Sequence, residues 1–148
     1  IEKILRWHKK VSIVPNGTKQ VLTIPSEQLS SGDKQKHTYL QIYLYDNKGI
    51  VSKKNVYFLP FKELILSRPE LEFSAENDKN NILYVTVTSK NFAKGVHVTC
   101  DSPNNFSDNF FDLPINGSKT ISMPIDTDTD IEALVESIQL RSLWNSRR

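Results

Sequence analysis

The most regular spacing of chemically active groups in this sequence belongs to three aspartates, Asp126, Asp128 and Asp130. Carboxylates at alternate positions can converge on one hard cation, as they do in the first half of a helix–loop–helix calcium site. Such a loop needs Gly at its sixth position and Glu at its twelfth, where this chain has Ile131 and Ser137. We therefore predict a solvated acidic loop and no dedicated metal site, with an incidental calcium ion as the alternative.

The other groups that commonly bind metals or act as nucleophiles are isolated. The histidines are scattered without metal-ligand spacing, at His8, His37 and His97. Cys100 is the single cysteine, and its place on the inward side of an alternating run predicts a buried, inert thiol. The chain also has no glycine-rich phosphate loop. The sequence therefore predicts no catalytic residue, no metal and no cofactor.

A row of tyrosines is the most distinctive surface of the first half. Residues 39–45 alternate in the way expected of a strand. Its two faces differ, with Tyr39, Tyr43 and Tyr45 on one and Leu40, Ile42 and Leu44 on the other. Aromatic rows can stack on sugar rings, but tyrosine also suits a domain interface, because its ring is apolar and its hydroxyl is polar. We prefer an interface or core face over a sugar platform, and expect no glycan binding there.

Composition and charge narrow the class of protein. Hydrophobic residues make up 38% and charged residues 24% of the 148 positions, which is typical of a folded globular chain. A net charge of +2 is too small to indicate a nucleic-acid or anionic-membrane partner. No apolar run approaches the roughly 20 residues that span a bilayer.

The start of the chain gives little information on its compartment. It begins at Ile1 without Met or a signal peptide, and we expect a fragment of a longer protein. The sequence leaves the location open: periplasmic or secreted in a bacterium, which we prefer, or lysosomal in a eukaryote. Three triplets have the form of glycan acceptors, which we attribute to chance, at Asn16, Asn105 and Asn116.

Alternating runs predict an all-β protein of two modules. In the first module, strands are expected within residues 1–14, 21–24, 39–45 and 56–59, with turns at 15–17 and 46–49 and a polar loop over 26–36. In the second, strands are expected at 71–75, 82–88, 96–100, 119–125 and 137–143, with one helical turn over 130–135. A Pro–Asn–Gly turn near Asn16 and a similar one near Asn116 suggest that the two modules are alike.

The chain is organised around a corner at residues 106–121, where phenylalanines stand among aspartate and asparagine before an Asn–Gly turn. Neighbouring strand residues point to opposite faces, so only one of Phe110 and Phe111 can enter the core. Three polar side chains are expected to bond nearby backbone amides, those of Asp108, Asn109 and Asp112.

The motif at this corner is Ser107, Asp108, Asn109, Phe110, Phe111, Asp112, Leu113 and Pro114. It resembles the Ser-Asp-Asn-Tyr/Phe-Phe-Asp-Leu-Pro-Gly stretch in the C-terminal immunoglobulin-like domain of β-mannosidases of glycoside hydrolase family 2. The chain departs from that pattern after Pro114, where Ile115 replaces the usual Gly. The resemblance implies tandem immunoglobulin-like β-sandwiches. Residues 67–148 would form the C-terminal sandwich, and residues 1–66 the C-terminal part of a truncated mannosidase immunoglobulin/carbohydrate-module-like domain.

The resemblance also implies a function and partners. The chain would be a non-catalytic accessory region of an enzyme that hydrolyses terminal non-reducing β-mannose, supporting upstream catalytic domains of the same parent chain. That chemistry needs two carboxyl groups about 5 Å apart. The later glutamates are expected on the surface instead: Glu63, Glu70, Glu72, Glu76, Glu132 and Glu136. The alternatives are a carbohydrate-binding sandwich for mannan-like glycans and, less favoured, an adhesion-type domain. A dimer through the truncated sheet is also open.

Overall fold

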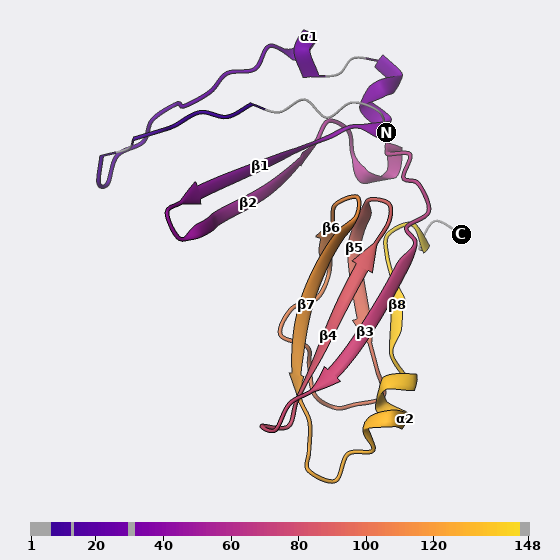
Figure 1. Ribbon diagram of the computed structural model, residues 1–148. Helices are drawn as coiled ribbons and strands as arrows, with labels where there is room; N and C mark the ends of the chain where they lie inside the picture. Colours follow the sequence, from indigo (N-terminus) through magenta and orange to yellow (C-terminus); the bar gives the residue numbers. More distant parts are fainter. Residues whose placement is uncertain (1–6, 13, 30–31, 146–148) are drawn as a thin grey trace. The chain divides into compact units, whose positions relative to one another are not determined.

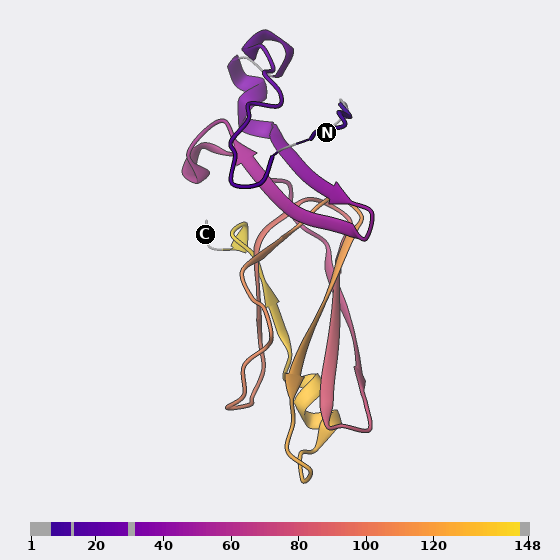
Figure 2. The same cartoon turned by 90° about the vertical axis from the view of Figure 1, so that its left-hand side faces the viewer.

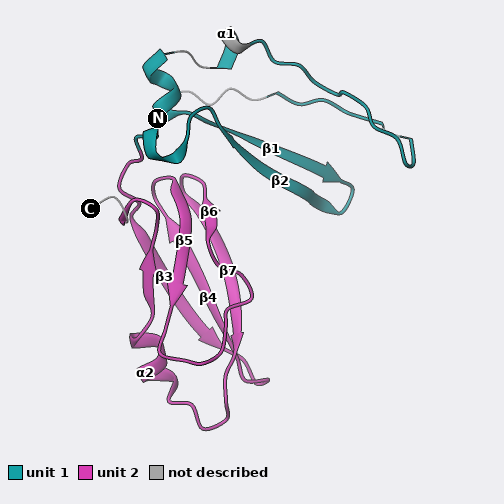
Figure 3. Cartoon of the chain, turned by 180° about the vertical axis from the view of Figure 1, so that it is seen from behind, with its two compact units in different colours: residues 1–65 teal, residues 66–148 magenta. Residues whose placement is uncertain are grey.

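The computed structural model describes residues 7–12, 14–29 and 32–145. The chain divides into two compact units, residues 1–65 and 66–148 (Figure 3). The predicted all-β class is confirmed, since the long elements of both units are antiparallel strands. No helix within the described ranges is long and apolar enough to cross a membrane.

The second unit is a sandwich of two antiparallel sheets (Figures 1 and 2). One sheet has the order β3-β4-β7, formed by Leu71–Asn77, Ile82–Ser89 and Gly117–Pro124. The other has the order β6-β5-β8, formed by Phe111–Leu113, Ala93–Thr99 and Gln139–Arg141. The chain changes sheet after β4, after β6 and again after β7, which ties the two layers together as in immunoglobulin-like folds.

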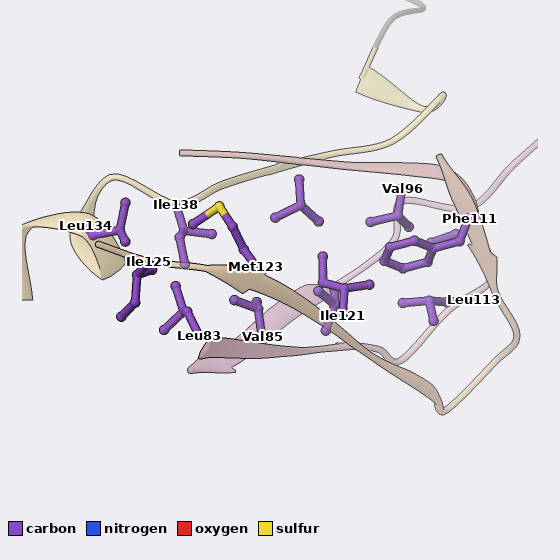
Figure 4. Packing of buried hydrophobic residues seen from close by; sticks show 13 residues of the cluster. Leu83, Val85, Val96, Phe111, Leu113, Ile121, Met123, Ile125, Leu134 and Ile138 are labelled. Atoms are coloured by element: carbon purple, nitrogen blue, oxygen red, sulfur yellow. The ribbon is translucent and has the colours of Figure 1, made fainter. Parts of the chain in front are cut away.

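The core of this unit comes from the inward positions of facing strands. On β4 the burial alternates, with Leu83, Val85 and Val87 fully enclosed and Tyr84 and Thr88 exposed. The rest of the cluster shown in Figure 4 comes from β7 of the same sheet (Ile121 and Met123), from the facing sheet (Val96, Val98, Phe111 and Leu113) and from the connections (Ile125, Leu134 and Ile138). Full burial of each such aliphatic side chain contributes roughly 1.5–3 kcal/mol. This cluster therefore holds the two sheets face to face.

A short helix closes one end of the core. The predicted helical turn is confirmed as α2, Ile131–Glu136. Asp130 caps it, because its carboxylate accepts a hydrogen bond of 3.1 Å from the backbone N–H of Ala133. Leu134 is its buried residue, and it joins the core beside β7 (Figure 4). The last strand, β8, has three residues and is shorter than the expected 137–143.

The first unit contains a two-stranded hairpin. β1 spans Tyr39–Asp46 and β2 spans Gly49–Tyr57, joined by the predicted Asp46–Gly49 turn. The Asp46 carboxylate accepts hydrogen bonds from the N–H groups of Lys48 and Gly49 at 2.7 and 3.0 Å, which fixes that turn. β2 starts earlier than the predicted 56–59, because its polar residues pair with β1 although their side chains are exposed.

The prediction of two strands in the first unit is wrong for its described residues, because neither strand is present there. Residues 7–12 and 21–24 have no strand assignment, while the predicted turn at Pro15–Gly17 is present. The rest of the predicted first strand, residues 1–6 and 13, lies outside the described residues. A strand needs a hydrogen-bonded neighbour, and alternation in sequence does not provide one. The described residues contain no ladder partner for these segments.

The polar loop predicted over 26–36 is also wrong, because much of it is helical. α1 spans Ser26–Leu29 and a 3-10 helix, η1, spans Gly32–His37. Local bonds explain both, since the Gln28 N–H donates to the Pro25 carbonyl at 3.0 Å, and Lys36 pairs with Asp33 at 2.7 Å. A second 3-10 helix, η2, spans Phe61–Glu63.

Candidate functional site

Asn109 is the central polar residue of the corner that precedes β6. Its Oδ1 accepts a hydrogen bond from the Val98 N–H and its Nδ2 donates to the Val98 carbonyl, both at 2.8 Å. Val96 pairs with Phe111 in the β5–β6 ladder, so Asn109 stands opposite Val98 in the same register. The side-chain amide therefore takes the place of a backbone amide and adds one rung to the ladder.

Asp112 holds an irregularity in β5. The register between β5 and β6 shifts between Ala93 and Val96, and Gly95 there has a φ of +59°. Asp112 accepts hydrogen bonds at 2.9 Å from the Gly95 N–H and from the Lys94 ammonium. The side chains of Lys94 and Asp112 are 19% and 12% exposed, so solvent screens this pair less than a surface ion pair. The carboxylate thus fixes the bulge that lets β6 pair with β5.

Ser107 and Asp108 make the opposite connection, to the other sheet. The Ser107 N–H donates to the Ser122 carbonyl at 2.6 Å and its Oγ accepts from the Ser122 N–H at 2.9 Å, so it pairs with β7. Asp108 forms an ion pair with Lys119, also on β7, and this bond lowers the pKa of the Asp108 carboxyl. The first two residues of the motif therefore bind β7 of one sheet, whereas Asn109 and Asp112 bind β5 of the other, so the motif clamps one edge of the sandwich.

One of the two adjacent phenylalanines is buried and the other is exposed, as predicted. Phe111 is 8% exposed and lies beside Val96 in the core (Figure 4). Phe110 is 67% exposed and stacks on His97, with 4.4 Å between the ring centroids. Phe110 precedes β6 and has a φ of +58°, a conformation that costs a bulky residue roughly 1–3 kcal/mol. The sequence did not reveal this left-handed position.

The turn after Pro114 completes the corner. The Gly117 N–H donates to the Pro114 carbonyl at 2.9 Å, and Asn116 has a φ of +53°. A Cβ on Gly117 would lie 2.5 Å from the proline ring, so the turn needs glycine. The first unit has a related turn, in which the Gly17 N–H donates to the Val14 carbonyl at 3.1 Å and Asn16 has a φ of +58°.

The tyrosine face of β1 is internally paired. Tyr39 stacks on Tyr57 with centroids 6.1 Å apart, and Tyr43 stacks on Tyr45 at 5.9 Å. Lys53 lies 5.7 Å from the centre of the Tyr43 ring. Tyr45 is 60% exposed, whereas Tyr39 and Tyr43 are half-buried. The rings therefore form two stacked pairs, and Tyr45 presents the most open surface of the row.

One of the three aspartates of this loop has a structural role. Asp130 caps α2, and the Asp126 carbonyl accepts a hydrogen bond from the Thr129 N–H. Over the residues that the structure describes, no three His, Cys, Asp or Glu side chains are grouped to hold a metal ion. Cys100 is partly exposed and not fully buried as expected. Desolvation raises the pKa of its thiol, which disfavours the reactive thiolate.

Two family models match the chain in tandem. Residues 66–146 match the model of the mannosidase Ig-fold domain, and residues 2–63 match that of the mannosidase Ig/CBM-like domain. The chain belongs to the mannosidase Ig-fold family. No curated protein matches it at a significant level. The resemblance seen in the motif at residues 107–114 is therefore confirmed, and that motif is the clamp of the mannosidase Ig-fold sandwich.

The later glutamates of this mannosidase Ig-fold chain lie on its surface. Each of the six later ones is exposed, namely Glu63, Glu70, Glu72, Glu76, Glu132 and Glu136. Glycoside hydrolysis of the retaining type needs a pair of carboxyl groups about 5 Å apart around a sugar-sized cleft. Glu70 borders a groove, but it is the single carboxylate among the groove's lining residues.

That groove is a feature which sequence reasoning missed. It measures about 400 Å³ and is lined by Arg68, Pro69, Glu70, Leu71, Leu140, Trp144 and Asn145. Its walls come from the segment that enters β3 and from β8 with the turn after it. β3 and β8 are edge strands of opposite sheets of the mannosidase Ig-fold sandwich. The signal for this groove in the sequence is Trp144, an aromatic residue that lies outside the predicted strands.

Proposed function

We propose that this chain is the non-catalytic C-terminal accessory region of a β-mannosidase of glycoside hydrolase family 2. The parent enzyme hydrolyses terminal non-reducing β-mannose residues. The observation that carries the proposal is the tandem match, in which both parts of the chain belong to mannosidase-associated domains. The engagement of Ser107, Asp108, Asn109 and Asp112 in the clamp supports a structural role, because these side chains bind backbone or lysine within the sandwich.

In this proposal the partners are the upstream catalytic domains of the same parent chain. The accessory region supports those domains. Nucleic acid and membrane are not proposed, because the net charge of +2 offers little attraction for either. A dimer through the hairpin is the other candidate assembly. Both strands of a two-stranded sheet are edge strands, which can pair with another strand, and within the described residues β1 and β2 form a sheet of two strands.

Two measurements test this function. The isolated chain should not hydrolyse a chromogenic β-mannoside, since its glutamates are spread over the surface. Turnover that survives repurification and is lost in Glu70→Gln would contradict the proposal. Deletion of residues 66–148 from the parent enzyme should lower the thermal midpoint of its catalytic domain. A midpoint equal to that of the intact parent would rule out the supporting role.

A carbohydrate-binding module for mannan-like glycans is the second candidate, and the exposure of Tyr45 favours it. A ring that is 60% exposed and stacked on Tyr43 could receive a sugar on its open face. Calorimetric titration with manno-oligosaccharides separates the two functions. Binding that disappears in Tyr43→Ala, with the far-UV spectrum unchanged, would favour the module. We expect the tyrosine face to show no such binding.

A further inference from the structure

We propose that the groove beside Trp144 binds one neutral sugar unit, a hexopyranose such as a mannose residue of an oligosaccharide. The site lies entirely within the second unit. It goes beyond the accessory role proposed above, and it does not depend on the identity of the parent enzyme. Its support comes from the shape of the groove, the chemistry of its lining and the way in which that lining is held.

The shape follows from the topology of the sandwich. β3 and β8 are edge strands of opposite sheets and share no ladder, so the sandwich is open along this side. The groove occupies one end of that opening, between residues 68–71 and residues 140–145. Its volume of about 400 Å³ lies at the lower end of the range for small-molecule sites, about 300–1,000 Å³. That size suits a single sugar unit better than an extended polymer.

The lining combines an apolar surface with polar groups of both kinds. Leu71, Leu140 and the half-buried Trp144 provide the apolar surface. The Arg68 guanidinium lies 5.7 Å from the Trp144 ring centre and is a donor only, while the Glu70 carboxylate is an acceptor. A pyranose has C–H faces that pack on aromatic rings and hydroxyls that both donate and accept. A phosphate or carboxylate ligand would be attracted by Arg68 but repelled by Glu70, so the lining offers an anion no net charge attraction.

The polar groups and the aromatic ring are held in place by the sandwich. Lys90 forms an ion pair with Glu70 at 3.0 Å, which restrains the carboxylate at the rim of the groove. Asn145 accepts hydrogen bonds from the N–H and the hydroxyl of Ser142 at 2.8 and 3.2 Å, which orders the turn that carries Trp144. A site of this kind loses less conformational entropy on binding than a mobile loop does. Its described lining has one carboxylate, whereas retaining hydrolysis uses two about 5 Å apart, so we expect binding of sugar without hydrolysis.

Tryptophan fluorescence of the full chain gives a direct test. The chain has two tryptophans, so Trp7→Phe leaves Trp144 as the single reporter. The probes are methyl β-mannoside, β-1,4-mannobiose and cellobiose, with galacturonate as an anionic control. We expect a saturable change of Trp144 emission with a neutral sugar, with a Kd in the millimolar range, and a much weaker response to galacturonate. Absence of a saturable change with every neutral sugar would overturn the proposal.

Variants locate the binding. Glu70→Gln should weaken it about tenfold, a loss typical of one charge-assisted hydrogen bond. Glu72→Gln is the matched control, because Glu72 lies 4.0 Å from the same Lys90 but outside the lining of the groove. Trp144→Phe, followed by calorimetry, should also weaken binding. An unchanged Kd in Glu70→Gln, or loss of binding in Tyr43→Ala instead, would refute the site. Neither result bears on deletion of residues 66–148 from the parent, which tests the accessory role separately.

Discussion

Removal of the Asn109 side chain should destabilise the second unit by about 2–4 kcal/mol. Asn109→Ala deletes both 2.8 Å bonds to Val98. It leaves the backbone N–H and carbonyl of Val98, a residue that is 1% exposed, without their Asn109 partners. Each unsatisfied buried backbone group costs about 1–3 kcal/mol. The sum is reduced because water can reach the corner from its exposed side, where Phe110 lies.

Urea unfolding of the full chain in the Trp7→Phe background measures this loss, because Trp144 then reports the second unit alone. Asn109→Asp keeps the acceptor but loses the Nδ2 donor, and it should fall between the wild type and Asn109→Ala. Asn105→Ala is the control, since Asn105 is an exposed asparagine of the same loop and surface changes rarely exceed about 0.5 kcal/mol. If Asn109→Ala matches Asn105→Ala, the amide rung contributes nothing and the clamp has no energetic basis.

Two further predictions concern the same corner. Phe111→Ala should cost about 3–5 kcal/mol of unfolding free energy, whereas Phe110→Gly should cost little or stabilise, because glycine accepts the positive φ without strain. Equal losses for both in urea unfolding would show that Phe110 is also part of the core. The pKa of Asp108 is lower in the folded state than its ordinary value of 3.8, so the ionised carboxylate stabilises the fold at pH values above 3.8. This contribution is lost as the pH falls through the lowered folded-state pKa. Acid titration followed by circular dichroism should therefore show a shallower loss of stability below about pH 4 in Asp108→Asn than in the wild type, and identical acid curves would contradict this.

The sandwich strands were predictable because their burial alternates along single segments. Leu83, Val85 and Val87 face the core at every second position, so the periodicity of the sequence predicts both the strand and its buried face. The first unit was less predictable. Residues 7–12 and 21–24 have strand-like composition, but a strand exists through its hydrogen-bonded neighbour, and sequence composition does not specify that neighbour.

Parts of the corner and the groove could not be predicted for different reasons. The polar residues of the corner were expected to bond nearby amides, but not to reach β5 and β7, because strand register sets those contacts. The φ of Phe110 follows from anchoring by its neighbours, since a bulky residue has no preference for that conformation. Trp144 meets Arg68 across 76 positions of sequence, so the groove exists only after both sheets have formed.

The rung made by Asn109 also bears on how sequences of this family should be interpreted. An aspartate lacks the donor, a leucine of similar shape lacks both polar groups, and a glutamine is longer by one methylene. Asparagine therefore meets the demand at this position best, and both of its amide bonds are made to the backbone of Val98. Invariance of this asparagine among related chains would record the geometry of a strand pairing, and it should not be taken as the mark of a catalytic group.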